Sequence, residues 1–518
     1  MSGPGFLKGA FILSVAAFVS KLLGLLYVIP LKHYAGDEGL ALYQAVFPIY
    51  NTLLILSVSG IPIALSKLIS EKIAYDQIGE IRPITMGALK IMITVAIGGF
   101  IVLFFGSSLI ANWIGSVDTI PSIEAMAFAM VLVPFLAVLR GYFYGYQKMN
   151  LSAMSQIIEQ LVRVSVMMLL VYLFVRMGKD IATVSAGAAI GSFAGISVAL
   201  SLLVYQYLRF RPHSKERKAQ QENYTRQILG IAIPVSLSTL MLPVLGLVDS
   251  MTIMNVLKST GIADSTAQFG VYSRGVPIVQ FAAFYATGLS VAVVPALTSA
   301  RLVEEKTKQI RKTLEVSFFI GVPASVGMML IANPLNILFY GNSQGSETLS
   351  VLAASTIFLS LAITTSGVLQ GLGRSIWPAL FLFLSVFLKV VGNIWLVKVY
   401  GIVGAAYSTI LAYACITILS LIAIRVFHPS SDLFLKRDCI RWFFPSILMG
   451  VGIYLFKGLG IDSLQVSNLI RIQALFSMVM IIMVGVVIYV VGLLLFRVFT
   501  WHDILHLRSG ILKIRKRG

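Results

Sequence analysis

The sequence has little charge for its length. Only 12% of its 518 residues are Asp, Glu, Lys or Arg, whereas 58% are hydrophobic and the mean hydropathy is +0.90. Soluble domains carry about 25% charged residues. The polar surface available here is too small to cover a water-facing globule, which excludes a soluble enzyme, a disordered chain and a secreted disulfide scaffold. We therefore predict a polytopic integral membrane protein.

The shortage of cysteine and the lack of a phosphate-binding loop exclude further classes of function. The chain has only two cysteines, Cys415 and Cys439, and they lack the spacing of a zinc site. It has no GxxxxGK[ST] phosphate-binding loop, since Gly178-Lys179 is followed by Asp180 instead of Ser or Thr. No nucleophile–base pair argues for catalysis, so we predict no catalytic residues, no metal site and no cofactor. Because no ATP-binding loop is found, any transport by this protein is predicted to be secondary, driven by sodium, protons or the membrane potential.

Long apolar runs recur along the whole chain. About 20 such residues cross the hydrocarbon core as a helix, so the sequence predicts an all-α fold with fourteen transmembrane helices. The spans begin near Phe6, Leu42, Ile84, Ser122, Ser155, Val184, Ile228, Gly270, Leu314, Leu349, Trp377, Val403, Trp442 and Ala474.

Positive charge gathers in every second connection. The connections after odd-numbered spans, such as 31–41 and 251–269, are poor in Lys and Arg, whereas those after even-numbered spans, such as 209–226, are rich in them. Because cytoplasmic loops carry the excess of Lys and Arg, we predict that both termini are cytoplasmic. The formal net charge of +19 then marks the cytoplasmic face and does not indicate a nucleic-acid partner.

Two parts of the chain resemble each other. The segments 140–163 and 366–389 both contain Gly-x-x-x-Gly, and they place Arg163 and Lys389 at the same offset. This repeat predicts two six-helix lobes related by an axis along the membrane normal, with a substrate site at their interface. The predicted domains are a first lobe at 1–208, a basic cytoplasmic linker at 209–226, a second lobe at 227–430, and two added helices with a basic tail at 431–518.

Charged side chains inside apolar spans are costly and mark functional sites. Cations outnumber acids among them, and a wet cavity lined in this way would attract an anion such as phosphate or pyrophosphate. Glu159 lies four residues before Arg163 on one helix face, so these two side chains can also simply neutralise each other. The candidate substrate-binding residues are Lys21, Arg274, Arg163, Lys389 and Glu159, and Asp249 is a candidate cation site.

Motifs in the first, second and eighth spans, and in the connection between the first two, carry a family resemblance. They are Phe6-Leu-Lys-Gly9, Ser20-Lys21-Leu-Leu-Gly24, Gly36-Asp-Glu-Gly39, Gly60-Ile-Pro62 and Tyr272-Ser-Arg274. With these residues the chain resembles the polysaccharide-transport branch of the MOP/MATE superfamily, and within it the MurJ-type lipid II flippases and the stage V sporulation protein B relatives. The resemblance implies a flippase in the bacterial plasma membrane. It would move undecaprenyl-pyrophosphate-linked saccharide to the outer leaflet by alternating access through a central cationic cavity between two lobes.

The resemblance also implies roles for single positions. Lys21 and Arg274 fall where the family has cavity arginines in its first and eighth helices. Asp249 and Asn393 fall where some members bind sodium, but Val397 replaces the acid that those members have one turn after the Asn. Two further family arginines, and an acidic partner one turn after Arg274, have no counterpart here. The implied partners are a lipid-linked oligosaccharide, the bilayer and cell-wall synthesis proteins, and a monomer is favoured.

Other functions stay open on the sequence alone. A cation-coupled multidrug exporter of the same superfamily would favour acidic and aromatic cavity residues. A membrane scaffold for envelope or spore assembly would not need charges at mid-bilayer. An integral glycosyltransferase would have a large outer loop with acidic or His groups, whereas the outer loops expected here are short.

Overall fold

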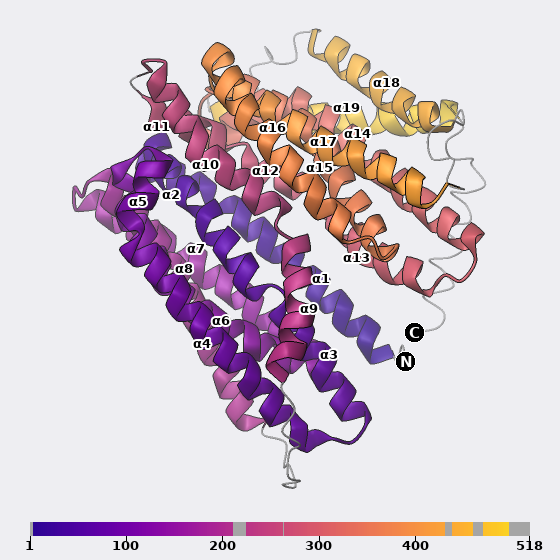
Figure 1. Cartoon of the computed structure of the whole chain (residues 1–518). Coiled ribbons are helices and arrows are strands. Elements are labelled where there is room, and N and C mark those ends of the chain that lie inside the picture. The colour runs from indigo at the N-terminus through magenta and orange to yellow at the C-terminus, as the bar shows by residue number, and fades with distance from the viewer. Residues whose placement is uncertain (1–3, 211–223, 263, 430–437, 459–469, 497–518) are drawn as a thin grey trace. The chain divides into compact units, whose positions relative to one another are not determined.

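Nearly the whole described chain is helical. The computed structural model describes residues 4–210, 224–262, 264–429, 438–458 and 470–496 (Figure 1). No β-strand occurs in these ranges, and the predicted all-α class is confirmed. Most of the predicted linker 209–226 and of the C-terminal basic tail lies outside the described residues. The α-helices are α1 (Pro4–Leu26), α2 (Val28–Val58), α3 (Ile61–Ala74), α4 (Ile81–Phe105), α5 (Ser107–Ile114), α6 (Ile120–Gly145), α7 (Met149–Arg176), α8 (Ile181–Arg209), α9 (Tyr224–Ser238), α10 (Met241–Ser259), α11 (Ser265–Ser273), α12 (Val276–Ala282), α13 (Phe284–Ser299), α14 (Val303–Tyr340), α15 (Ser346–Gly371), α16 (Ile376–Tyr400), α17 (Ile402–Phe427), α18 (Asp438–Gly458) and α19 (Ile470–Leu495).

The helices are long and apolar enough for a multi-pass membrane protein. Within the described residues, 12 segments could each cross a bilayer. The first of them, Ile12–Ala74, is 63 residues long and runs through α1, α2 and α3. Phe443–Gly458 in α18 is apolar but shorter. The polytopic architecture is therefore confirmed, while the number of fourteen spans and the cytoplasmic position of both termini stay predictions.

Several predicted boundaries are wrong in detail. The predicted connection 31–41 lies within the bounds of α2 and contains Gly36, a non-helical residue at which a kink divides α2 into two helical parts. Gly36 has φ 70° and ψ −173°, a conformation that glycine adopts without a steric penalty. The predicted seventh span is divided into α9 and α10, and the predicted eighth into α11, α12 and α13. Prolines near the starts of α10 and α12 favour these new helix beginnings because they lack an N–H to donate.

The chain divides into two compact units. Unit 1 comprises Met1–Phe281 and Pro378–Ser408, and unit 2 comprises Ala282–Trp377 and Thr409–Gly518. Unit 1 thus takes α16 from the later part of the chain. In unit 2, α14 packs against α15, α18 and α19, and α13 packs against α15. These bounds follow from packing and differ from the predicted lobes 1–208 and 227–430, which were defined by a repeat and stay a prediction.

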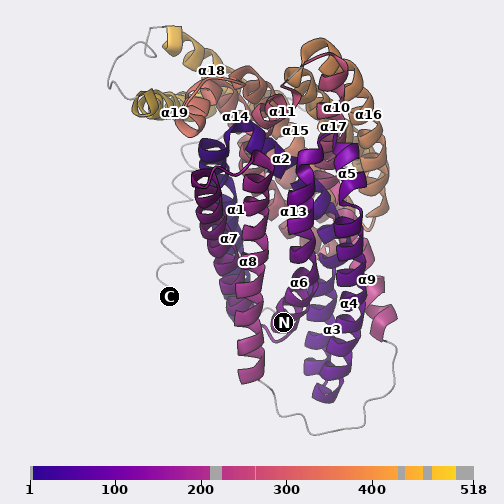
Figure 2. The ribbon, with the colours of Figure 1, turned by 90° about the vertical axis from the view of Figure 1, so that its left-hand side faces the viewer.

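Close helix packing in unit 1 depends on small residues. In Figure 2, α1, α7 and α8 run side by side, and α7 contacts both of the others. On α8, Gly191 and Gly195 face α7. A Cβ at Gly195 would lie 2.4 Å from the carbonyl oxygen of Glu159, and one at Gly191 would lie 2.7 Å from that of Arg163. These glycines let the α8 backbone approach α7 beside two charged residues that the sequence predicts to be functional.

Replacing Gly195 with Ala should destabilise the protein. The new methyl group would overlap a backbone oxygen that cannot move without shifting α7, and such overpacking costs about 1–3 kcal/mol. Gly98→Ala in α4 is the matched control, because nothing lies within 4 Å of its Cβ position. Thermal unfolding in detergent should show a lower Tm for Gly195→Ala only. An unchanged Tm for that variant would show that the α7–α8 contact is looser than described.

Candidate functional site

Three clusters of buried or partly buried charged residues in unit 1 contain ion pairs. They join α6 to α7, α10 to α16, and α2 to α11. Five of the residues predicted from sequence take part in them: Arg163, Glu159, Lys389, Arg274 and Asp249. Each pair satisfies the requirement that a charge removed from water has a partner of opposite sign.

In the first cluster, Glu159 is shared by two arginines. Its Oε1 lies 2.8 Å from Nη2 of Arg163 on the same helix, and its Oε2 lies 2.8 Å from Nη2 of Arg140 on α6. Arg140 also donates from Nε to the Ser155 hydroxyl at 3.0 Å. Two guanidinium groups against one carboxylate leave this cluster with one net positive charge. The predicted neutralisation of Glu159 and Arg163 is therefore present, but it is incomplete.

Two tyrosines from α2 lie near Arg163. Tyr43 and Tyr50 are both buried and lie close enough to interact with its charge. The Nε of Arg163 and the hydroxyl of Tyr50 are buried without a hydrogen-bond partner among the described residues. Two donors are thus available beside a cluster with a positive charge. This arrangement suits an acceptor of negative charge.

Lys21 is the fourth predicted cation, and it lies on α1, which packs against α7. Its side chain is exposed and forms no ion pair with a described side chain. One turn later, a Cβ at Gly24 would lie 3.2 Å from Nε2 of Gln160. The chain segment that carries Lys21 is therefore close to the residue next to Glu159.

An apolar cavity lies between the same two helices. Its volume is about 340 Å³. The cavity is close to the charged residues along the chain. Ala16, which lines it, lies five residues before Lys21, and Ile158, which also lines it, is next to Glu159. Its lining residues are Ile12, Val15, Ala16, Asn150, Ala153, Met154, Ile157 and Ile158.

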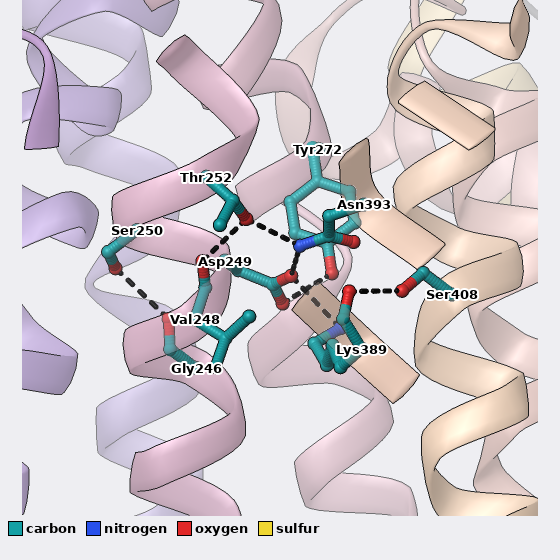
Figure 3. A network of polar contacts seen from close by, with 9 residues as sticks. All are labelled: Gly246, Val248, Asp249, Ser250, Thr252, Tyr272, Lys389, Asn393 and Ser408. Carbon is teal, nitrogen blue, oxygen red and sulfur yellow. Dashed lines mark hydrogen bonds and ion pairs between the residues drawn. The ribbon is translucent and has the colours of Figure 1, made fainter. Parts of the chain in front are cut away.

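The second cluster is centred on Asp249 in α10 (Figure 3). The Nζ of Lys389 lies 2.9 Å from Asp249 Oδ1, and Nδ2 of Asn393 donates to the same oxygen at 2.9 Å. The hydroxyl of Tyr272 donates to Oδ2 at 2.8 Å. Asn393 Nδ2 also donates to the hydroxyl oxygen of Thr252 at 2.7 Å. The carboxylate is thus held by an ammonium, an amide and a phenol.

Helix α16 contributes Lys389 and Asn393 to this cluster from its buried side, while its exposed side carries aromatic residues. Lys389 and Asn393 are buried, with exposed fractions of 1% and 0%, whereas Phe383 and Trp395 on the same helix are 75% and 72% exposed. Lys389 and Asn393 are four residues apart, which places them on one side of the helix. A helix that buries its polar side and exposes aromatic side chains is typical of a protein surrounded by lipid.

The sodium site that the resemblance implies does not fit this arrangement. Asp249 and Asn393 do lie together, as predicted, but an ammonium group already lies against the carboxylate and the amide turns its N–H groups toward it. Val397, one turn after Asn393, is buried and supplies no oxygen from its side chain. Among the described residues, no group of three or more His, Cys, Asp or Glu side chains could hold a metal ion.

The third pair joins Arg274 to Asp37. Nε of Arg274 donates to Asp37 Oδ1 at 2.7 Å and Nη2 donates to Oδ2 at 2.6 Å, a bidentate geometry. Arg274 is 1% exposed. The bend at Gly36 brings Asp37 against α11, so closely that a Cβ at Gly270 would lie 1.9 Å from the Asp37 carbonyl oxygen. Arg274 is thus paired, although the sequence offered no acid one turn after it.

Sequence reasoning missed several residues of these clusters. Arg140 was noticed only as part of a repeat, and Asp37 only as part of a motif. Tyr272 was noticed only as part of another motif, and Thr252, which is uncharged, gave no signal. For the two charged residues, the expectation that a buried cation needs an acid would have prompted a search for partners.

The chain matches two families of known proteins. It matches the family described as polysaccharide biosynthesis protein over residues 6–300 and the MatE family over residues 234–395. The uncharacterized membrane protein YabM of Bacillus subtilis (strain 168) is 33% identical over 432 residues, which cover 81% of this chain and 80% of YabM. The lipid II flippase MurJ of the same organism is 24% identical, and the match covers 86% of this chain and 87% of MurJ.

Solved structures share the fold. A lipid II flippase MurJ in an inward closed conformation aligns with a TM-score of 0.71 at 15% identity, covering 96% of this chain and 100% of that one. At this identity the likeness concerns the fold. Together with the apolar helices and the membrane-protein relatives, it places the chain among multi-pass bacterial membrane proteins.

Removing the shared carboxylate should cost much more stability than removing an exposed one. Glu159→Gln leaves two partly buried guanidinium groups without a counter-charge, and breaking a buried pair costs about 3–5 kcal/mol. Glu315→Gln on α14 is the control, because its pair with Arg311 is largely exposed and contributes about 0–1 kcal/mol. Thermal or denaturant unfolding measures both variants. Equal losses would contradict the assigned burial of the Glu159 cluster.

Proposed function

Since the chain belongs to the polysaccharide biosynthesis protein family of the MOP superfamily, we propose that it is a flippase for a lipid-linked saccharide. The chain is a transporter rather than an enzyme. Its proposed substrate is an undecaprenyl-pyrophosphate-linked saccharide of the lipid II type, which moves from the inner to the outer leaflet by alternating access through a cationic cavity. The relative named as a lipid II flippase, matched over most of both chains, supports this substrate class.

The observation that carries the proposal is the pairing of positive charge with an apolar cavity on α1 and α7. The pyrophosphate of such a lipid cannot cross bare hydrocarbon, because removing a charge from water without compensation is prohibitive. The Glu159 cluster keeps one net positive charge, and Lys21 on the neighbouring helix adds another. The cavity of about 340 Å³ beside them is lined mainly by apolar side chains, which suit a hydrocarbon tail.

Arg274 and Lys389 have a different place in this proposal. Both are almost fully buried and both have a carboxylate partner. In this conformation they stabilise contacts between helices, and a substrate anion would have to displace Asp37 or Asp249 to reach them. Interrupted helices, such as α9–α10 and α11–α12–α13, supply places where the backbone can bend during transport.

A second candidate is a cation-coupled multidrug exporter, which the MatE match over 234–395 favours. Such a pump needs acids free to bind a cationic drug. In the described residues, Asp37, Glu159 and Asp249 are each bound to a cation. Drug susceptibility of a deletion strain distinguishes the two functions, since only loss of an exporter makes cells more sensitive. A membrane scaffold, the remaining candidate, would tolerate substitution of all these charges.

Purified protein in liposomes should exchange labelled lipid II, or another prenyl-linked saccharide, between leaflets. Lys21→Ala should reduce the exchange rate by at least tenfold, because a lost charge-assisted hydrogen bond to an anion is worth about 1.5–3 kcal/mol. Lys21→Arg keeps the charge and should retain most of the exchange. Full exchange by Lys21→Ala would remove the residue from the substrate path, and no exchange of any prenyl-linked lipid by wild type would reject the function.

Neutralising both members of the third pair tests whether Arg274 contacts the substrate. Arg274→Gln alone leaves Asp37 without its partner and should lower both the Tm and the exchange rate. The double variant Arg274→Gln with Asp37→Asn should recover most of the Tm, because no unpaired charge is left. If Arg274 acts only through this pair, exchange recovers as well. An exchange rate that stays low in a stable double variant would make Arg274 a substrate contact.

A further inference from the structure

The cluster around Asp249 has the composition of a site for a monovalent cation, and its cation is part of the chain. We propose that the ammonium of Lys389 permanently replaces a free metal cation between α10 and α16, so that the protein binds no sodium there. This inference rests on the contacts of unit 1 and holds whichever substrate is carried.

The surrounding atoms are those that a hard cation prefers. Asp249 supplies two carboxylate oxygens, and hydroxyl oxygens come from Tyr272 and Thr252. The Oδ1 of Asn393 is buried without a hydrogen-bond partner among the described residues. Small alkali and alkaline-earth ions bind through such oxygens. The residues therefore have the chemistry of a cation site, while their present orientation serves a different occupant.

Lys389 is that occupant. Its Nζ lies 2.9 Å from Asp249 Oδ1, at the distance of a charge-assisted hydrogen bond. One ammonium balances one carboxylate, so the pair is neutral. A sodium ion added to this site would introduce a second positive charge in a buried place, and Asp249 is the one acid bound there among the described residues. Burial of an uncompensated charge is strongly unfavourable, which excludes the metal ion.

The ammonium is also held in place. The backbone carbonyl of Lys389 accepts a hydrogen bond from the Ser408 hydroxyl at 3.0 Å (Figure 3). One turn later, a Cβ at Gly392 would lie 2.7 Å from the same hydroxyl oxygen, so α16 lies tightly against the start of α17. With its backbone fixed and its side chain 1% exposed, Lys389 cannot reach water without opening this contact.

The orientation of Asn393 follows from the occupant. With an ammonium beside the carboxylate, Nδ2 donates to both Asp249 and Thr252, and Oδ1 is left without a partner. If the ammonium is removed, a turn of the amide by half a rotation presents Oδ1 to the same place. Loss of the lysine should therefore create a sodium site from oxygens that are already there.

The test compares the cation response of wild type with that of Lys389→Ala, using the purified full-length protein. Thermal unfolding is followed in NaCl and in choline chloride at equal ionic strength, and bound ²²Na⁺ is measured directly. Wild type should show the same Tm in both salts and no bound ²²Na⁺. Lys389→Ala should be less stable in choline. Sodium should raise its Tm by a few degrees, since a ligand that binds only the folded state stabilises it.

The double variant Lys389→Ala with Asp249→Asn is the matched control, because it has neither the ammonium nor the carboxylate and should bind no sodium. A sodium-specific Tm rise or bound ²²Na⁺ in wild type would overturn the proposal, even if the single variant cannot be purified. So would a purified Lys389→Ala without any sodium response. Neither readout uses a lipid, so a failure here is distinct from a failure of the flippase function.

Discussion

A buried charge must be balanced, and this constraint accounts for three of the contacts between helices of unit 1. Three carboxylates hold four cations, and each cluster joins two helices: α6 with α7, α10 with α16, and α2 with α11. The apolar side chains facing lipid gain little by changing neighbours, because lipid is as apolar as they are. Ion pairs and small residues such as Gly195 therefore specify contacts that hydrophobic burial cannot.

Much of the fold could be predicted because helices in lipid must satisfy all their backbone groups internally. A run of apolar residues then leaves few alternatives, and hydropathy alone gave the all-helical, multi-pass architecture. The interruptions were harder to predict. The kink at Gly36 falls inside the predicted connection 31–41, but a window of about 20 residues does not give its exact position, which depends on the backbone conformation of one residue. The breaks before α10 and α12 likewise depend on local backbone geometry, although the nearby prolines give a hint.

The site could be predicted in part. The contacts that were predicted from helix geometry join residues close in sequence, whereas those that were missed join residues far apart in sequence. Glu159 and Arg163 are one helical turn apart, so their contact follows from helix geometry. The proximity of Asp249 and Asn393 was predicted only from the family resemblance. The pairs between Arg274 and Asp37, and between Lys389 and Asp249, join residues on distant helices, and a single sequence does not say which helices pack. The rule that a buried cation needs an acid reduces the number of candidate partners but does not identify the partner.

Because the chain is synthesised from its N-terminus, the two members of each of these ion pairs are made at different times. Asp37 precedes Arg274 by 237 residues, and Asp249 precedes Asn393 on its partner helix by 144. At a synthesis rate of about 5–20 residues per second, the first acid waits on the order of 10–50 s for its arginine. Until then each aspartate must stay at the membrane surface or enter as the uncharged acid. The ion pair of Asp37 can therefore form only after Arg274 has been synthesised, and that of Asp249 only after Lys389.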